Sequence, residues 1–204
     1  SQEVAAVIAD DRYIAADAVE AVEVEYEPMQ AVVDPFKAME PDAPVLRPDK
    51  EGKTDNLIWH WETGEREATE KVFQNADVVV KENIYLPRIH VASIETCGCV
   101  ASFDPAEGKL TVWMTTQAPH AIRTVVALVA GHVGLSEEKI RIIAPDIGGG
   151  FGGKVPVYPG YVIAIAASVV IGKPVKWVED RSENLQADSF ARDYHMGVEF
   201  AANN

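Results

Sequence analysis

Three features that mark other protein classes are missing from this chain of 204 residues: long apolar runs, an excess of basic residues and a set of cysteines. No run of about 18 apolar residues occurs, so a transmembrane helix is not expected. The first residues also lack the basic and apolar pattern of a signal peptide. The formal net charge of −14 repels nucleic acid and anionic lipid, so neither is an expected partner.

The cysteine content is limited to Cys97 and Cys99. Two cysteines separated by a single residue cannot form an unstrained disulfide, and two thiols alone make a poor zinc site. No metal-ligand set is therefore predicted from the cysteines. A reducing compartment is the simplest inference, so we expect a cytoplasmic location.

The composition is that of a globular protein, with 48% apolar and 25% charged residues. Helical and strand patterns alternate with hairpin signals, which favours an α+β fold over a purely parallel α/β fold. We predict three parts. Residues 1–40 form the end of a small α/β domain, residues 41–76 form a linker that begins with a proline-rich stretch, and residues 77–204 form the first part of a larger domain.

Apolar periodicity and turn residues place the individual elements. The elements predicted before residue 77 are strands at 4–8, 22–26 and 57–62, a helix from Asp10 or Asp11 through Val22, a short helix ending at Met39 and a polar helix from Thr63 to Phe73. The elements predicted after it are strands at 77–86, 97–103, 110–116, 139–144, 175–178 and 194–200, and helices at 119–131, 161–171 and 181–187. Because the first strand has no start signal and the last residues follow another strand, we expect a fragment or one subunit of a split protein.

The most informative stretch is the segment Asp146–Lys154, in which five of nine residues are glycine. A strand precedes it and an Ala-rich helix follows it, an arrangement that suits the capture of an anion or a pyrophosphate. A plain tight turn is the alternative. The segment also matches a P-loop by letter, but Val155 stands where a P-loop needs Ser or Thr to hold magnesium. A dinucleotide-binding loop is disfavoured as well, because no acidic residue follows at the required distance.

Three segments at strand ends are candidates for chemistry: His90–Glu95, Thr115–His120 and Asp146–Lys154. Within them Glu95 is interpreted as a surface acid or a cap acceptor, and Gln117 as an exposed amide. His120 is interpreted as a base or ligand, or more simply as a structural histidine. No metalloprotease or Ser/His/Asp spacing is present. The residue chemistry by itself thus predicts an anion-binding α+β domain.

Five motifs add a resemblance that covers about residues 82–200. In order and spacing, the chain resembles the molybdenum hydroxylase family of xanthine dehydrogenase and aldehyde oxidase, and most of all its aerobic carbon monoxide dehydrogenase branch. The resemblance implies the end of a hammerhead-like small domain followed by a molybdopterin-binding domain of a large subunit. The motifs are Arg88–Cys99, Thr116–Thr124, Ile143–Gly152, Pro174–Arg181 and Ser189–His195.

The resemblance also implies a cofactor and residues that bind it. The cofactor is molybdenum with molybdopterin, in its cytosine dinucleotide form. The Gln117 amide would hydrogen-bond an oxo ligand of the metal, and the backbone of Gly149, Gly150, Phe151 and Gly152 would lie beside the metal and its pterin. Phe151 would shield the metal from water.

Partners and substrate are implied in the same way. A [2Fe–2S] small subunit and an FAD-binding medium subunit would accept electrons from the complete large subunit, in a dimer of heterotrimers. Val155 stands where purine hydroxylases of the family carry Glu, which favours a small or apolar substrate such as carbon monoxide. Aldehydes, aromatic N-heterocycles and an inactive assembly domain remain alternatives. The catalytic base and the signature cysteine of the family would lie beyond Asn204, so no catalytic residue is assigned.

Overall fold

The structure is a computed structural model that describes residues 3–204, and it divides into two compact units. One unit consists of Asn83–Gly197 together with the residues that precede Glu23. The other consists of Glu23–Glu82 and Val198–Asn204. Each unit is described by itself below.

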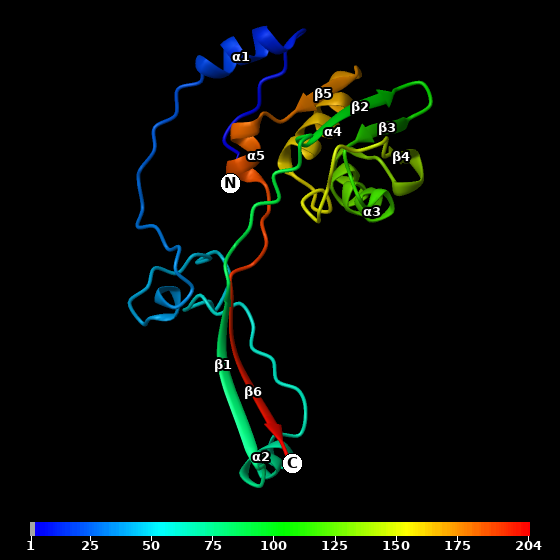
Figure 1. Ribbon diagram of the computed structural model, residues 1–204. Helices are drawn as coiled ribbons and strands as arrows, with labels where there is room; N and C mark the ends of the chain where they lie inside the picture. The colour runs from blue at the N-terminus through cyan, green and yellow to red at the C-terminus, as the bar shows by residue number, and fades with distance from the viewer. Residues whose placement is uncertain (1–2) are drawn as a thin grey trace. The chain divides into compact units, whose positions relative to one another are not determined.

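The first unit is built on a four-stranded sheet of strand order β4-β3-β2-β5 (Figure 1). Strands β2 (Gly98–Asp104) and β3 (Lys109–Met114) form the predicted antiparallel hairpin. β5 (Val175–Val178) pairs antiparallel with β2 on one side, and β4 (Ile140–Ile143) pairs parallel with β3 on the other. The parallel pair has a consequence for the site, because the segments that follow β3 and β4 leave the sheet at the same edge.

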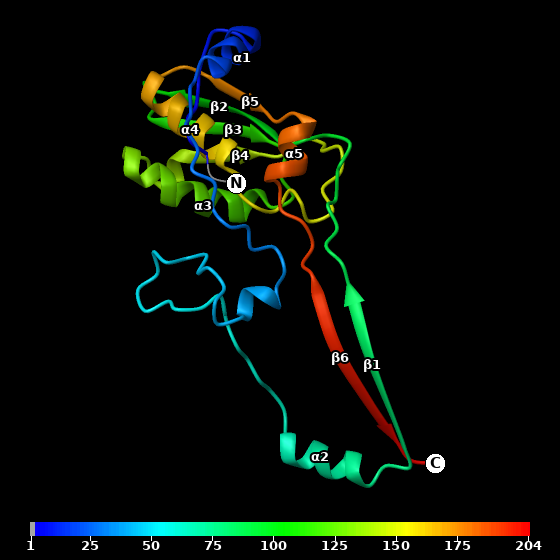
Figure 2. The same ribbon diagram turned by 90° about the vertical axis from the view of Figure 1, so that its left-hand side faces the viewer.

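Two helices cover this sheet, α3 (Pro119–Ala130) and α4 (Pro159–Ile171) (Figure 2). A proline begins each helix, a position where its fixed φ suits the first turn and its missing N–H costs nothing. The hydrophobic core forms where they meet alternate residues of β2 and β3. The largest fully buried side chains are Tyr161, Leu110, Met114, Ile122, Ile165, Val112 and Val126.

Shorter elements complete the unit. Helix α1 (Arg12–Glu20) begins as predicted, with the Asp11 carboxylate accepting the N–H groups of Tyr13 and Ile14. Helix α5 (Arg181–Ala187) begins with a capping box, in which Asp180 and Glu183 cap its N-terminus. Two 3-10 turns, η2 (Gly131–Val133) and η3 (Glu137–Lys139), join α3 to β4.

The remaining elements are η1 (Lys37–Met39), α2 (Arg66–Gln74) and a two-stranded ribbon formed by β1 (Val78–Leu86) and β6 (Tyr194–Ala202). Every residue of β1 is exposed. Lys81 and Glu199 bridge the ribbon with a 2.8 Å ion pair. Among the described residues, no helix combines the length and apolar character needed to span a lipid bilayer.

The α+β class is confirmed, but the strands predicted at 4–8, 22–26 and 57–62 are wrong. An alternating segment becomes a strand only when a second backbone satisfies its N–H and C=O groups. Within residues 3–77 the structure provides no such partner strand. The helix predicted to begin at Thr63 begins later, because Gly64 has a φ of 96° and α2 starts after Glu65.

Candidate functional site

Two segments that both follow strands of the sheet come together at its edge. The residues after β3 lead into Gln117, and the residues after β4 lead into the glycine segment Asp146–Lys154, named here the glycine loop. The backbone N–H of Gln117 donates to the carbonyl of Lys154 at 3.0 Å. The parallel pairing of β3 and β4 therefore brings together two of the three segments that the sequence marked as candidates.

The side-chain oxygen of Gln117 is bound to the glycine loop. Gln117 Oε1 accepts the backbone N–H groups of Gly152 at 3.0 Å and of Lys154 at 3.2 Å. Two donors aimed at one atom identify that atom as the oxygen of the amide and not its nitrogen. The amide NH₂ of this exposed residue makes no hydrogen bond within residues 3–204, so it is available to a ligand.

The approach of Gln117 depends on Gly150. A Cβ atom on Gly150 would lie 2.5 Å from Cδ of Gln117, closer than real Cβ contacts allow. Gly148 is restricted in the same way, since its Cβ would lie 2.6 Å from Cβ of Glu95. At both positions a neighbouring side chain occupies the space that a methyl group would fill, so any other residue would displace the Gln117 amide or Glu95.

The backbone of the loop presents hydrogen-bond donors. Gly149 and Gly152 have φ of 94° and 90°, and Phe151 has φ of 49°. In the part of the chain that the structure describes, the N–H groups of Gly149, Gly150 and Phe151 donate to no protein acceptor. Successive free N–H groups in a loop with left-handed residues form a concave site for an anion.

Phe151 combines backbone strain with an exposed side chain. A non-glycine residue at positive φ costs roughly 1–3 kcal/mol and occurs most often at functional positions. The ring is 76% exposed, so packing within this chain does not offset that cost. The predicted shielding role requires something outside residues 3–204 for the ring to cover, and it stays a prediction.

An ion pair between buried Lys154 and Glu95, whose side chain is 40% exposed, joins the glycine loop to the segment that precedes β2. The Lys154 side chain is 2% exposed, and its Nζ lies 2.7 Å from Oε2 of Glu95. The same oxygen accepts the N–H of Gly148 at 2.7 Å. Partial burial raises the pKa of Glu95, but the hydrogen bonds from Lys154 and Gly148 and the charge of Lys154 outweigh it, so the net pKa is lowered.

This pair was missed by sequence reasoning, which treated Glu95 as a surface acid or cap acceptor. Fifty-nine positions separate the partners, and no local pattern signals the contact. The pair also removes the P-loop alternative, because the Lys154 ammonium is buried against a carboxylate and is not presented to a phosphate.

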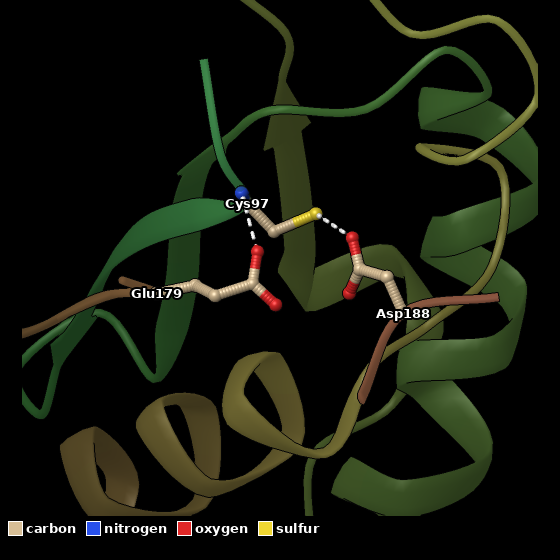
Figure 3. A group of neighbouring side chains, drawn as sticks. All are labelled: Cys97, Glu179 and Asp188. Carbon is tan, nitrogen blue, oxygen red and sulfur yellow. Dashed lines mark hydrogen bonds between the residues drawn. The ribbon is translucent and has the colours of Figure 1, made fainter. Parts of the chain in front are cut away.

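A cluster of buried polar side chains joins the start of β2 to the end of β5 and to α5. Figure 3 shows Cys97, Glu179 and Asp188 with their polar atoms turned toward one another. Glu179 Oε2 accepts the N–H of Cys97 at 3.0 Å, and the Cys97 thiol lies 3.5 Å from Asp188 Oδ2. Asn184 Nδ2 donates to both carboxyl groups, at 3.0 Å and 2.6 Å.

These three groups lie within 4.8 Å of one another, a spacing that a metal ion could use. Two contacts favour a hydrogen-bonded cluster instead. The Asn184 amide already donates to both carboxyl groups, and Arg181 fixes its orientation by donating to its oxygen at 2.6 Å. Burial raises the pKa of Cys97 to about 12, so in this hydrogen-bonded arrangement the thiol is protonated. The cluster therefore holds the elements around the site in place.

The two candidate histidines differ. His90 has a structural role, since Nδ1 accepts the N–H of Ala92 and Nε2 donates to the carbonyl of Asn184 at 2.9 Å. His120 is exposed and lines a cavity of about 250 Å³ beside α3. Arg123 and Arg141 line the same cavity, and Arg123 is paired with Glu137 at 3.1 Å.

Together these features define a class of protein: an α+β domain whose glycine loop and anchored amide present unpaired donors, an arrangement that suits an anionic ligand. The molybdopterin cofactor-binding domain family matches residues 39–204. The chain belongs to that family, which confirms the resemblance seen in its motifs.

Individual relatives place the chain within the family. It is 59% identical over 98% of its length to the carbon monoxide dehydrogenase large chain of Hydrogenophaga pseudoflava, and covers 26% of that protein. It is 36% identical over 97% of its length to the nicotine 6-hydroxylase large subunit of Paenarthrobacter nicotinovorans, and covers 23% of it. Among solved structures, the reconstituted CO dehydrogenase from Oligotropha carboxidovorans matches at 57% identity with a TM-score of 0.88, over 96% of this chain and 25% of that one.

The chain thus spans about a quarter of the length of the curated relatives it matches. The family supports molybdenum–molybdopterin as the cofactor. The roles of Gln117, Gly149, Gly150, Phe151 and Gly152 remain predictions, to which the geometry above adds an anchored amide and free backbone donors.

Proposed function

We propose that this chain is the molybdopterin-binding part of a large subunit of a carbon-monoxide-dehydrogenase-like molybdenum hydroxylase. The observation that carries the proposal is the Gln117 amide, held by its oxygen on the glycine loop with its NH₂ group left free. The high identity to carbon monoxide dehydrogenase large chains supports the same reaction class. The enzyme would oxidise a small substrate with oxygen derived from water.

The residues fit the cofactor through their donors. The free N–H groups of Gly149, Gly150 and Phe151 would hold anionic oxygen or sulfur atoms, and the Gln117 NH₂ would donate to an oxygen ligand. Gly152 would keep Gln117 in place through its N–H. When bound, the cofactor supplies the redox chemistry, and the chain supplies binding, orientation and a preorganised set of donors.

A small or apolar substrate is favoured by Val155, which is 48% exposed directly after Lys154. An apolar side chain there offers no hydrogen bond to a polar ring substrate. An aldehyde or aromatic N-heterocycle is the second candidate, supported by the similarity to nicotine 6-hydroxylase and to the quinoline 2-oxidoreductase from Pseudomonas putida 86, matched at 29% identity with a TM-score of 0.79.

The finer assignments belong to the same proposal. The cofactor would carry the cytosine dinucleotide, and a [2Fe–2S] small subunit and an FAD-binding medium subunit would take up the electrons in a cytoplasmic dimer of heterotrimers. The names "large chain" and "large subunit" of the relatives support smaller partners. Residues 1–40, 41–76 and 77–204 would be the end of a small domain, a linker and the first part of the cofactor-binding domain.

The test is purification of the complete complex, followed by analysis of molybdenum and pterin and by assays with carbon monoxide, nicotine and an aldehyde. We expect molybdenum and pterin in the complex and turnover with carbon monoxide. A complex without molybdenum or pterin overturns the proposal. Turnover with nicotine or the aldehyde alone selects the second candidate. Residues 1–204 by themselves should be inactive, as an assembly domain, because they hold only part of the cofactor site.

A further inference from the structure

The ion pair between the buried Lys154 ammonium and the partly exposed Glu95 carboxylate is the strongest feature that the proposed function leaves unused. We propose that this pair is a positioning device, which holds the glycine loop and the Gln117 amide in the geometry needed for turnover. The expected effect of the pair on turnover rests on the proposed function. The expected effect of the pair on the position of the glycine loop does not, because it depends only on contacts within this chain.

Every polar group of Lys154 is bound to the site. Its backbone N–H donates to Gln117 Oε1 at 3.2 Å, and its carbonyl accepts the Gln117 N–H at 3.0 Å. The same carbonyl accepts the hydroxyl of Thr116 at 3.2 Å. Its ammonium donates to Glu95 at 2.7 Å. A shift of Lys154 would therefore move both ends of the Gln117 residue.

Glu95 fixes the other end of the loop. Its backbone N–H donates to the carbonyl of Gly148 at 3.2 Å, and its carboxylate accepts the N–H of Gly148 at 2.7 Å. One oxygen atom, Oε2, thus binds both Gly148 and Lys154, the first glycine of the loop and its last residue. The free donors of the loop lie between these two attachment points.

Stability alone is a weak explanation for this arrangement. Replacing a buried charged group and its partner by apolar residues is often neutral or stabilising, because desolvation of the buried charge cancels much of the attraction. Burial of the Lys154 side chain, which is only 2% exposed, therefore costs desolvation free energy that an apolar side chain would not cost. The pair instead fixes positions, because one carboxylate can accept hydrogen bonds from a backbone N–H and from an ammonium and so hold both donors at one defined point.

The experiment separates charge compensation from positioning in the complete enzyme. Glu95→Gln leaves the buried Lys154 cation without its counter-charge, so it should lower both thermal stability and rate. The double variant Lys154→Met with Glu95→Gln leaves no uncompensated charge, so its stability should return toward wild type. If the pair positions the loop, turnover per bound molybdenum in the double variant stays about 10- to 100-fold low, the effect expected when reacting groups are displaced by about 1 Å.

The matched control is Lys109→Met with Glu107→Gln, which removes an exposed ion pair from the turn between β2 and β3. It should leave stability and turnover unchanged. Wild-type turnover per molybdenum in the double variant Lys154→Met with Glu95→Gln overturns the positioning role.

Hydrogen exchange of peptides that contain Gly148 and Gly152 gives a readout independent of the cofactor. We expect at least about tenfold faster exchange of these amides in the double variant Lys154→Met with Glu95→Gln, since an attachment point of the loop is lost. Unchanged exchange overturns the proposal. If the wild-type complex holds no molybdenum, the proposed function fails, whereas the exchange result still decides whether the pair holds the loop.

Discussion

The buried side chains of Glu179 and Asp188 accept hydrogen bonds from the same donor, the side-chain amide of Asn184. Both residues are at most 5% exposed, and one oxygen of Asp188 has no partner among the described residues. Burial raises the pKa of Glu179, and hydrogen bonding and repulsion from Asp188 add to this effect against the lowering influence of the Cys97 N–H and Asn184. The folded state thus favours the protonated form of Glu179.

The first prediction concerns pH and stability. A raised pKa in the folded state contributes stability that is complete below the ordinary value of 4.5 and is lost as the pH rises through the folded pKa. Glu179→Gln fixes the neutral form and keeps an acceptor for Cys97 and Asn184. We therefore expect the difference in unfolding temperature, Glu179→Gln minus wild type, to be more positive at about pH 8 than at about pH 5.

Thermal unfolding of the complete subunit at both pH values measures this difference. Glu107→Gln is the control, because that carboxylate is exposed and remote from the cluster. A pH-independent difference between Glu179→Gln and wild type would show that Glu179 is ionised in the folded state throughout this range.

The second prediction separates the two functions of the Gln117 amide. Gln117→Glu keeps an acceptor for the N–H groups of Gly152 and Lys154 but removes the free NH₂ donor. We expect turnover to fall about 100- to 1000-fold, the usual effect of losing a donor that stabilises developing charge, with the loop still ordered. Gln117→Ala loses both functions, so it should also speed hydrogen exchange at Gly152. Turnover per molybdenum and exchange rates are the measurements, and wild-type turnover in Gln117→Glu would remove the amide from the mechanism.

The third prediction tests the close approach at Gly150. In Gly150→Ala the added methyl group would lie 2.5 Å from Gln117 Cδ, so the amide must move. Overpacking of this kind costs about 1–3 kcal/mol, and we expect reduced molybdenum content together with slow turnover. Gly131→Ala is the control, since a Cβ there meets nothing within 4 Å and the residue lies at the end of a helix. Full molybdenum content and normal turnover in Gly150→Ala would refute a role for this contact.

The fourth prediction distinguishes the Phe151 backbone from its side chain. Phe151→Gly removes the ring and also relieves the positive φ of 49°, whereas Phe151→Ala removes the ring and keeps the strain. We therefore expect the glycine variant to be more stable than the alanine variant by roughly 1 kcal/mol. Both should lose the same shielding of the cofactor, measured as faster loss of molybdenum on dilution. If neither variant loses molybdenum faster than wild type, the shielding role is wrong.

Local patterns in the sequence were sufficient for most elements of residues 77–204. The turn residues Asp104–Gly108, Pro119 and the apolar periodicity after it predicted a hairpin and a helix that the structure confirms. The helix buries Ile122, Val126 and Ala130, whereas Val125 is 41% exposed. The motifs likewise sufficed for the family, because glycine composition and motif spacing are written directly in the chain.

The sequence by itself therefore determined the α+β class, the glycine loop and the family, since these depend on residue type and short-range periodicity. Only the tertiary structure decided that Lys154 pairs with Glu95, that Gln117 presents its NH₂ group, and that three predicted strands find no partner. The physical reason is that these outcomes depend on contacts between distant segments. The parallel pairing of β3 with β4 brings together Gln117 and Gly152, which are 35 positions apart, and no periodicity within either segment encodes that contact.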